Sequence, residues 1–352
     1  MTSSSSLPKD FLDAHHHFLD TATNGETFSK FLGKLVPNSS YLDDDYFRDV
    51  IEPLQKAGVN AQGSIHMECL PDNGIEEAKW VSNIVQNSST SSIQAIIASC
   101  NLAQEASIVE KELEALAQID KVKGIRWIVD CVGKFNGKDA THVSTSRHDG
   151  IDYLRGSDGG YDGKALPAFE TGFGLLQKHN LTFDLQCAPV QLEAAAALIA
   201  RHPNTKVVID HLGKPRTLLG PDTEENRANT TLDEAELASW RRGMNCIATN
   251  PNVYVKISML GYAIPGWIRT KERIELMKYL VQETVEIFGP ERCMVATNWY
   301  ANAAASDSDG LSDVGPDILQ FIELIYGFLK DDYSEEELDR MFCTTAKEFY
   351  NL

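Results

Sequence analysis

The sequence predicts an α/β protein built as a single (β/α)8 barrel. Short runs of β-branched and aliphatic residues recur along the chain, and each is followed by polar turn residues and then by a longer stretch with helical spacing. About eight such units occur, which is the number in a barrel of this kind. The length of 352 residues is compatible with one barrel, and no linker or internal repeat divides the chain.

Each predicted strand is a short apolar run that ends in polar residues. The strands are predicted at residues 11–17, 60–68, 93–100, 122–129, 181–187, 206–211, 252–257 and 292–297. Helices are predicted between and after them, at residues 43–57, 75–86, 104–117, 167–179, 191–201, 233–248, 271–288, 318–329 and 334–349. Their boundaries have physical causes: Asp43 offers a carboxylate to the free N–H groups that open a helix, and Pro203 disfavours helical geometry just before it.

Two irregular stretches interrupt this pattern, at residues 133–166 and 214–232. Both follow strand ends, and the loops after strands form the catalytic face of such a barrel. We therefore expect two insertions on that face, serving either as lids and substrate walls or as solvated loops. Residues 1–10 are Ser-rich and are predicted to form a disordered tail, so that residues 11–352 form one barrel domain with C-terminal helices.

The composition favours a cytoplasmic protein that acts on small molecules. Fifty-one Asp and Glu residues against 32 Lys and Arg give a formal charge of -19, which repels nucleic acid and anionic lipid. Seven widely spaced cysteines without a C-x-x-C pair suggest neither a disulfide framework nor a thiolate zinc site. No export signal or membrane span is visible in the sequence.

The first predicted strand ends in three consecutive histidines. Because side chains alternate along a strand, Asp13, His15 and His17 are expected on one face, and Ala14 and His16 on the other. Two imidazoles spaced in this way can bind a divalent metal ion or donate hydrogen bonds to a carbonyl oxygen. The alternative is that they are structural histidines, satisfied by their neighbours in a polar core layer.

Polar residues also end other predicted strands. The same alternation places Ser64, His66 and Glu68 on one face at the end of the second strand, where Glu68 is expected to join the mouth and His66 to bind substrate. Arg126 ends the fourth strand, and its guanidinium is expected either to bind a substrate carboxylate or to neutralise Glu68. Gln186 adds an amide at the end of the fifth strand.

His211 is the strongest single catalytic candidate in the sequence. It follows the apolar run Val-Val-Ile at residues 207–209, where the sixth strand reaches the barrel mouth. Four cations fall at or just beyond strand ends, namely Arg126, Lys214, Arg216 and Lys256. In an acidic chain this placement predicts an anionic or polyhydroxylated small-molecule substrate, unless each cation pairs with a carboxylate such as Asp130 or Asp210.

Eight motifs occur in the order found in a known family: D-A-H-H-H-F, H-x-E, G-I-R-W, F-D-L-Q, V-I-D-H-L-G-K-P, N-V-Y-V-K-I-S, E-R-C-M-x-A-T-N-W and A-K-E-F-Y-N-L. The chain resembles the amidohydrolase-related family, in the branch that holds sugar lactonases and 2-pyrone-4,6-dicarboxylate lactonase. The resemblance implies a distorted (β/α)8 barrel that hydrolyses a cyclic ester. It also implies a site drawn from His15, His17, Arg126 and His211.

The sequence departs from this family at the end of the eighth strand. Catalytic members commonly have an aspartate there that activates the attacking water, whereas this chain has Asn298, whose neutral amide takes no proton from water. Glu68 or one of the histidines is then expected to act as the base. His15, His17 and His211 suffice for one zinc-class ion, and without a metal the imidazoles and Arg126 would polarise the carbonyl.

Three functions follow from this pattern and remain open at this point. The first is a hydrolase that opens a small sugar lactone or a carboxylated pyrone. The second is a small-molecule binder that keeps the barrel but is catalytically impaired by Asn298. The third is a metal-dependent decarboxylase, which Asn298 disfavours because it occupies a metal-ligand position. Assembly into a homo-oligomer is compatible with each of them.

Overall fold

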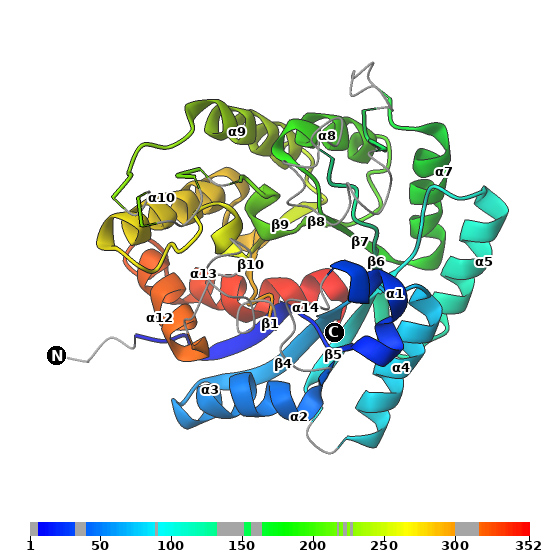
Figure 1. Ribbon diagram of the computed structural model, residues 1–352, viewed down its shortest axis with the longest axis horizontal. Helices are drawn as coiled ribbons and strands as arrows, with labels where there is room; N and C mark the ends of the chain where they lie inside the picture. Colours follow the sequence, from blue (N-terminus) through cyan, green and yellow to red (C-terminus); the bar gives the residue numbers. More distant parts are fainter. Residues whose placement is uncertain are drawn as a thin grey trace.

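The computed structural model describes residues 6–31, 40–88, 91–131, 151–155, 164–216, 218–220, 224–225, 228–299 and 317–352. In these residues a ring of strands lies at the centre and helices surround it (Figure 1). The fold is the predicted (β/α)8 barrel. Most of the expected insertion at residues 133–166 and part of the one at residues 214–232 lie outside the described residues, as do residues 1–5 of the expected tail.

Eight parallel strands of the described chain form one sheet in sequence order. They are β1 (Asp10–His16), β4 (Asn60–Met67), β5 (Ile93–Ser99), β6 (Val122–Arg126), β7 (Thr182–Leu185), β8 (Val207–Ile209), β9 (Val253–Ile257) and β10 (Cys293–Val295). A parallel bridge between His16 and Trp299 joins the two ends of the sheet. Two backbone bonds reinforce the bridge: Asn298 N–H donates to the His15 carbonyl at 2.8 Å, and His17 N–H to that of Trp299 at 2.5 Å.

Helices lie around this sheet and at its two ends. They are α1 (Thr21–Phe31), α2 (Asp43–Tyr46), α3 (Glu52–Lys56), α4 (Gly74–Asn87), α5 (Ala106–Ala117), α7 (Pro167–Leu175), α8 (Leu192–Ala200), α9 (Glu234–Ala248), α10 (Lys271–Phe288), α12 (Ile318–Leu329), α13 (Glu335–Asp339) and α14 (Thr345–Tyr350). Side chains cap several N-termini, as in α4, where Asn73 accepts from the N–H groups of Ile75 and Glu76.

Several local features were not predicted, among them α1. The expected helices at residues 43–57 and 334–349 are each interrupted by a π-helical turn, at Phe47–Ile51 between α2 and α3 and at Arg340–Thr344 between α13 and α14. A short antiparallel pair of strands, β2 (Leu19–Asp20) and β3 (Ser40–Tyr41), follows β1. It lies beside the His16–Trp299 bridge that closes the barrel, since the Trp299 indole N–H donates to the Tyr41 hydroxyl at 2.7 Å.

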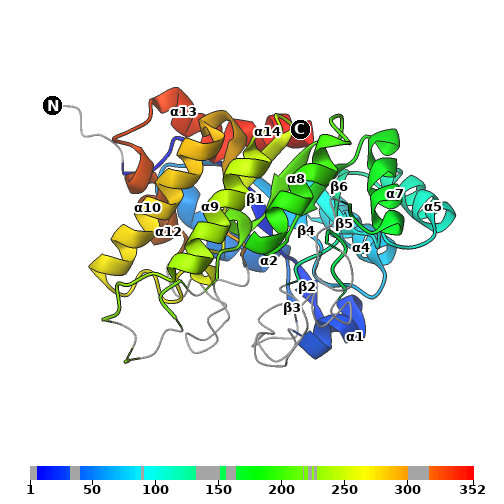
Figure 2. The ribbon, with the colours of Figure 1, turned by 90° about the horizontal axis from the view of Figure 1, so that it is seen from above.

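The interior of the barrel is apolar below its mouth. One buried cluster combines inward-facing strand residues with side chains of the C-terminal helices: Leu12, Ala14, Ile65, Met67, Ala95, Ile97, Val208, Met294, Ala296, Cys343, Ala346, Phe349 and Tyr350. Figure 2 shows α13 and α14 at one end of the barrel and the β2–β3 strand pair with α1 at the other. The C-terminal helices therefore close the end opposite the mouth.

Gly74 should be intolerant of a side chain, because it opens α4 directly against β5. A Cβ atom there would lie 1.9 Å from the Ser99 carbonyl oxygen. We expect Gly74→Ala to lower the free energy of unfolding by about 1–3 kcal/mol in urea titrations. Gly327→Ala is the matched control, since nothing lies within 4 Å of its added Cβ and it should stabilise α12 by about 0.5–1 kcal/mol. Equal effects of the two variants would contradict this explanation.

No helix in the described ranges is both long and apolar enough to cross a membrane.

Candidate active site

A bulge in β1 directs two histidines into the barrel mouth. The register between β1 and β4 shifts between Asp13 and His16. Ala14 belongs to the apolar barrel interior, and His15 also faces inward, where its Nδ1 lies 3.4 Å from Lys256 Nζ. Asp13 was expected on the same face as His15 and His17. That expectation was wrong, since Asp13 accepts hydrogen bonds from the Tyr46 hydroxyl on α2 and from Thr297.

The imidazoles of His15 and His17 meet at the mouth. Their Nε2 atoms lie 3.3 Å apart. Nδ1 of His17 lies 3.0 Å from the carbonyl oxygen of Met67, and a carbonyl only accepts, so this nitrogen carries the proton. Nε2 of the neutral His17 ring is therefore an acceptor, and Asn298 Oδ1 lies 3.2 Å from it.

His211 joins this pair from the loop after β8. Its ring centre lies 4.9 Å from that of His15, and its Nδ1 lies 2.9 Å from Ser258 Oγ. His211 and Leu212 have φ angles of 58° and 56°, a left-handed conformation that is costly for residues with side chains. Asn298 and Met259 adopt the same conformation, so strained residues are concentrated around the mouth.

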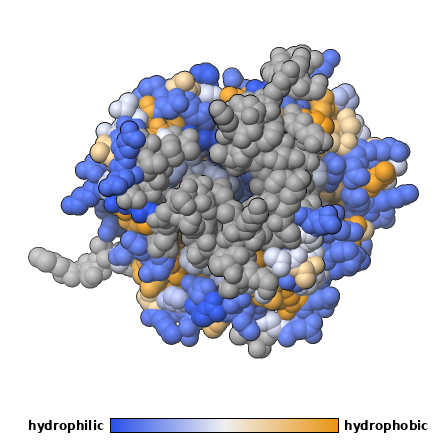
Figure 3. Space-filling view, viewed as in Figure 1, coloured by the Kyte–Doolittle hydropathy of each residue, from blue (hydrophilic) through white to orange (hydrophobic). Residues whose placement is uncertain are grey.

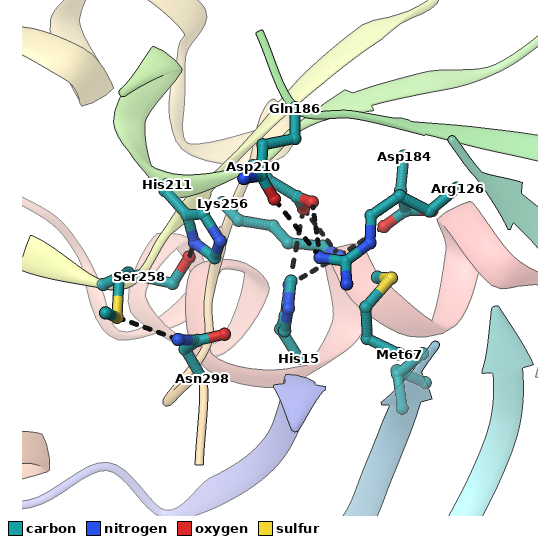
Figure 4. Close-up of polar contacts among 12 residues, drawn as sticks. His15, Met67, Arg126, Asp184, Gln186, Asp210, His211, Lys256, Ser258 and Asn298 are labelled. Atoms are coloured by element: carbon teal, nitrogen blue, oxygen red, sulfur yellow. Dashed lines mark hydrogen bonds and ion pairs between the residues drawn. The ribbon is translucent and has the colours of Figure 1, made fainter. Parts of the chain in front are cut away.

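Asp210 is a further site residue that the sequence analysis considered only as an ion-pair partner. Its buried carboxylate lies 3.4 Å from His15 Nδ1, 3.1 Å from Lys256 Nζ and 3.6 Å from Arg126 Nη1 (Figure 4). Burial alone would raise its pKa, but Lys256 and His15 hold that pKa well below the usual range. Asp210 is thus an anion at neutral pH. Its position directly before His211 was the sequence signal for it.

Arg126 is fixed by Glu68 on one side of the mouth. Its Nε lies 2.7 Å from Glu68 Oε1, its Nη2 donates to the Glu68 carbonyl at 2.7 Å, and its Nη1 reaches Gln186 Oε1 at 3.4 Å. The second carboxylate oxygen of Glu68 accepts from the Leu70 N–H at 2.9 Å. Of the two expected roles of Arg126, neutralisation of Glu68 is confirmed, and Glu68 holds the guanidinium in place.

His66 lies outside this cluster. Ile65 and Met67 fill the barrel interior, so His66 faces the helices, where its Nδ1 accepts from the Phe18 N–H at 3.2 Å. Its ring packs 5.8 Å from that of His16. The face assigned to His66 was wrong, because the interior layer at this level of β4 is apolar and the polar ring is turned outward.

The other cations at strand ends are paired. Lys256 is completely buried and forms ion pairs with Asp184 and Asp210. Lys214 and Arg216 both pair with Asp130, and the Lys214 ammonium lies 4.8 Å from the centre of the Tyr262 ring, which also packs on His211. The coloured part of the face seen in Figure 3 is mostly hydrophilic, with small scattered apolar patches.

The burial of Lys214 predicts a pH dependence of stability. Burial lowers its pKa to about 8, despite Asp130, whereas the unfolded chain keeps a value near 10.5. Between these values the unfolded state binds more protons, so this lysine makes stability rise with pH from about 8 to about 10.5. In urea titrations the wild type should gain up to about 3 kcal/mol over Lys214→Met across this interval. Parallel pH profiles of the two proteins would contradict the assignment.

Burial keeps the imidazoles of the mouth neutral. It lowers the pKa of His17 to about 4 and lowers the pKa values of His15 and His211 well below the usual value. Arg126 adds to the effect at His17, whereas Asp210 opposes it at His15 and His211. Neutral rings can accept a proton from water or bind a metal ion.

The residues present fit a single divalent ion. If the proton of His15 is on Nδ1, the lone pairs of His15 Nε2, His17 Nε2 and Asn298 Oδ1 are gathered in one place and repel one another unless a cation or a proton lies among them. A metal-bound histidine usually donates its other N–H to a carbonyl or carboxylate, as His17 does to Met67. A second donor set, His15, Asp210 and His211, has ligand atoms within 4.8 Å of one another.

Imidazoles, carboxylates and a guanidinium at the C-terminal ends of barrel strands form the kind of site found in (β/α)8 enzymes. The chain belongs to the amidohydrolase family, which it matches over residues 12–352. The family resemblance read from the motifs is confirmed.

Among curated relatives, the L-fucono-1,5-lactonase of Burkholderia ambifaria is 23% identical over 301 residues, which cover 84% of this chain and 81% of that protein. An amidohydrolase structure from Burkholderia multivorans with bound zinc is 20% identical, with a TM-score of 0.65 over 97% of this chain and 99% of that one. A putative 2-pyrone-4,6-dicarboxylic acid hydrolase from Pseudomonas putida is 13% identical, with a TM-score of 0.59 over 98% of both chains.

Dihydroxybenzoate decarboxylase structures also share the fold, at 11–12% identity and TM-scores of 0.52 to 0.56. At such low identity the likeness concerns the fold alone.

Proposed function

We propose that the barrel mouth hydrolyses a small cyclic ester, with a polyhydroxylated lactone as its substrate. The observation that carries this proposal is the cluster of neutral, buried imidazoles of His15, His17 and His211 beside the fixed guanidinium of Arg126. Neutral imidazoles supply bases, and the guanidinium supplies a donor for developing negative charge. A lactone is a reactive acyl centre, so it suits a site without a strongly basic carboxylate.

His211 is the proposed general base. Its Nδ1–H can donate to Ser258 Oγ at 2.9 Å, which leaves Nε2 as the acceptor, and no described residue bonds to that atom. Asp210 is the neighbouring anion that would stabilise the imidazolium formed when His211 takes a proton from water. Glu68 has both carboxylate oxygens engaged, so it orients Arg126 and does not act as the base.

The residues around His15 and His17 would polarise the lactone carbonyl. Arg126 can donate from its guanidinium to the carbonyl oxygen, and one imidazole N–H can add a second bond. If a divalent ion is bound, His15 and His17 with Asn298 would hold it. A zinc-class ion there supplies a Lewis acid for the carbonyl and lowers the pKa of bound water.

The pairing of the cations favours a neutral, hydroxyl-rich lactone over a carboxylated pyrone. Each cation predicted at the mouth has a carboxylate partner among the described residues: Arg126 with Glu68, Lys256 with Asp184 and Asp210, and Lys214 and Arg216 with Asp130. A carboxylated substrate would have to displace one of these carboxylates. Hydroxyl groups can instead donate to the carboxylates and accept from the cations without breaking a pair.

A panel of aldonolactones and pyrone carboxylates tests this proposal. We expect the wild type to hydrolyse at least one aldonolactone well above the uncatalysed rate, with pyrone dicarboxylates slower. The double variant His15→Ala, His17→Ala is the control for adventitious hydrolysis, and assays with and without chelator separate metal-dependent from metal-free turnover. Rates no higher than the uncatalysed rate across the panel would refute the proposal.

A further inference from the structure

A tyrosine from the loop after β9 packs against the proposed base. Tyr262 ends a 3-10 turn, Leu260–Tyr262, and its backbone N–H donates to the Met259 carbonyl at 3.1 Å. The centre of its ring lies 5.6 Å from that of His211, and the two ring planes meet at 62°. This edge-to-face arrangement is favoured between aromatic rings, so the contact is attractive as well as space-filling. None of the roles proposed above uses Tyr262.

A buried ammonium contacts the same tyrosine ring. Lys214 Nζ lies 4.8 Å from the ring centre of Tyr262, within the distance at which an aromatic face attracts a cation. The side chain of Lys214 is 1% exposed and pairs with Asp130, whose other carboxylate oxygen pairs with Arg216. Withdrawal of the ammonium would break a buried ion pair. Lys214 is therefore a fixed anchor for the tyrosine ring.

Tyr262 joins the two ends of one strained turn. The four residues 211–214 after β8 have φ angles between 56° and 68°. Left-handed residues that carry side chains are costly, and a run of them persists only where the surroundings hold it. The ring of Tyr262 contacts the first side chain of this turn, His211, and the last, Lys214. It therefore supports the turn that presents His211 to the mouth.

The plane of the His211 imidazole needs a restraint from packing. Ser258 Oγ lies 2.9 Å from Nδ1 and fixes that corner of the ring (Figure 4). The torsion that turns an imidazole about its Cβ–Cγ bond has a broad energy minimum, so one hydrogen bond leaves the direction of the second nitrogen loosely defined. The ring contacts with His15, at 4.9 Å, and with Tyr262 supply the missing restraint.

We infer that Tyr262 is a positioning residue: its ring, anchored by Lys214, holds the plane of the His211 imidazole in the mouth, where catalysis requires a fixed direction for the second nitrogen. The inference rests on the proposed function for the role of His211, but the restraint on the ring does not depend on turnover. Both contacts of Tyr262 use its aromatic ring and neither uses its hydroxyl. Phenylalanine should therefore replace it, and leucine should not.

Kinetics of Tyr262→Leu and Tyr262→Phe test this inference. Leucine should lower kcat for lactone hydrolysis by about 10- to 100-fold, the cost of a catalytic group displaced by roughly 1 Å, and should leave KM within about twofold. Phenylalanine should keep kcat within about twofold of wild type. Tyr279→Leu is the matched control, because Tyr279 on α10 is 63% exposed, and it should behave as wild type. Equal losses in the leucine and phenylalanine variants would overturn the inference.

A double-variant comparison separates positioning from a merely structural role. In a His211→Ala background no imidazole remains to be positioned, so Tyr262→Leu should cause no further loss of rate. The same fold-loss in the wild-type and His211→Ala backgrounds would show that Tyr262 acts independently of His211, which contradicts the inference.

Carbon NMR relaxation of the His211 ring gives a readout that needs neither hydrolysis nor a folded core variant. In the metal-free wild type we expect the order parameter of its Cε1–H bond to be about 0.85, the value of rigid backbone, with the signal assigned by its loss in His211→Gln. Tyr262→Phe should keep this value, and Tyr262→Leu should lower it below about 0.6. A mobile His211 ring in the wild type, or a rigid one in folded Tyr262→Leu, overturns the inference. Absence of lactone hydrolysis would refute the proposed function and leave this readout intact.

Discussion

Replacing His211 with alanine should lower kcat/KM for lactone hydrolysis by about 10²–10⁴-fold, the range that a general acid–base group contributes. The loss is expected because burial lowers the pKa of His211 and keeps its ring neutral, and because Ser258 holds its Nδ1. A decrease in kcat with little change in KM would indicate that the ring acts on the attacking water more than on substrate binding.

Two controls make this prediction specific. His211 has a φ angle of 58°, so alanine there adds backbone strain, and the variant must first show a wild-type unfolding transition. His202→Ala removes a histidine that contacts Glu170 on the outside of the barrel, and it should leave the rate unchanged. A His211→Ala protein that is folded and as active as wild type would rule out His211 as the base.

Replacing Asn298 with aspartate should tighten zinc binding by about 10- to 100-fold, because a carboxylate then lies beside the Nε2 atom of His17. The left-handed backbone at Asn298, with φ of 54°, is nearly as accessible to aspartate as to asparagine, so the fold should tolerate the change. Calorimetric zinc titration of the two proteins measures the effect, and equal affinities would contradict the placement of Asn298 in the donor set.

Asn298→Asp also separates the hydrolase from an impaired binder. If His211 is the base, lactone hydrolysis by the variant should remain near the wild-type rate in the presence of chelator. A gain of more than about tenfold by the variant alone would show that the natural protein is catalytically impaired. Asn180→Asp is the matched control, because Asn180 has a φ angle of 58° but lies outside the barrel mouth.

Strand positions were predictable because each combines an apolar run with a polar end. All eight predicted strands overlap observed ones, since a strand buried on both faces leaves a local hydrophobic signal. The two-residue strands β2 and β3 leave no such signal. The orientation of His66 was missed because the first apolar layer of the barrel, with Ile65 and Met67, decides which face of β4 is inward.

The sequence brought candidate residues together where a motif coincides with a strand end, and it missed contacts between residues that are distant in sequence. His15, His17, His211, Arg126 and Asn298 all reach the mouth, since parallel strands present their C-terminal ends together. The bulge that separates Asp13 from His15 depends on pairing with β4 and leaves no trace in the alternation. The contact of Tyr350 with Asp184 spans 166 residues, so no local sequence pattern could predict it.

That long contact has a consequence for synthesis in the cell. At roughly 5–20 residues per second, translation from Asp184 to Tyr350 takes about 10–30 s. During this delay Asp184 and Lys256 lack the hydroxyl and the aromatic ring of Tyr350, so this buried cluster is completed only after the ribosome has passed Tyr350. A nascent chain stalled upstream of this tyrosine would therefore carry every proposed catalytic side chain and still lack the contact that joins α14 to β7.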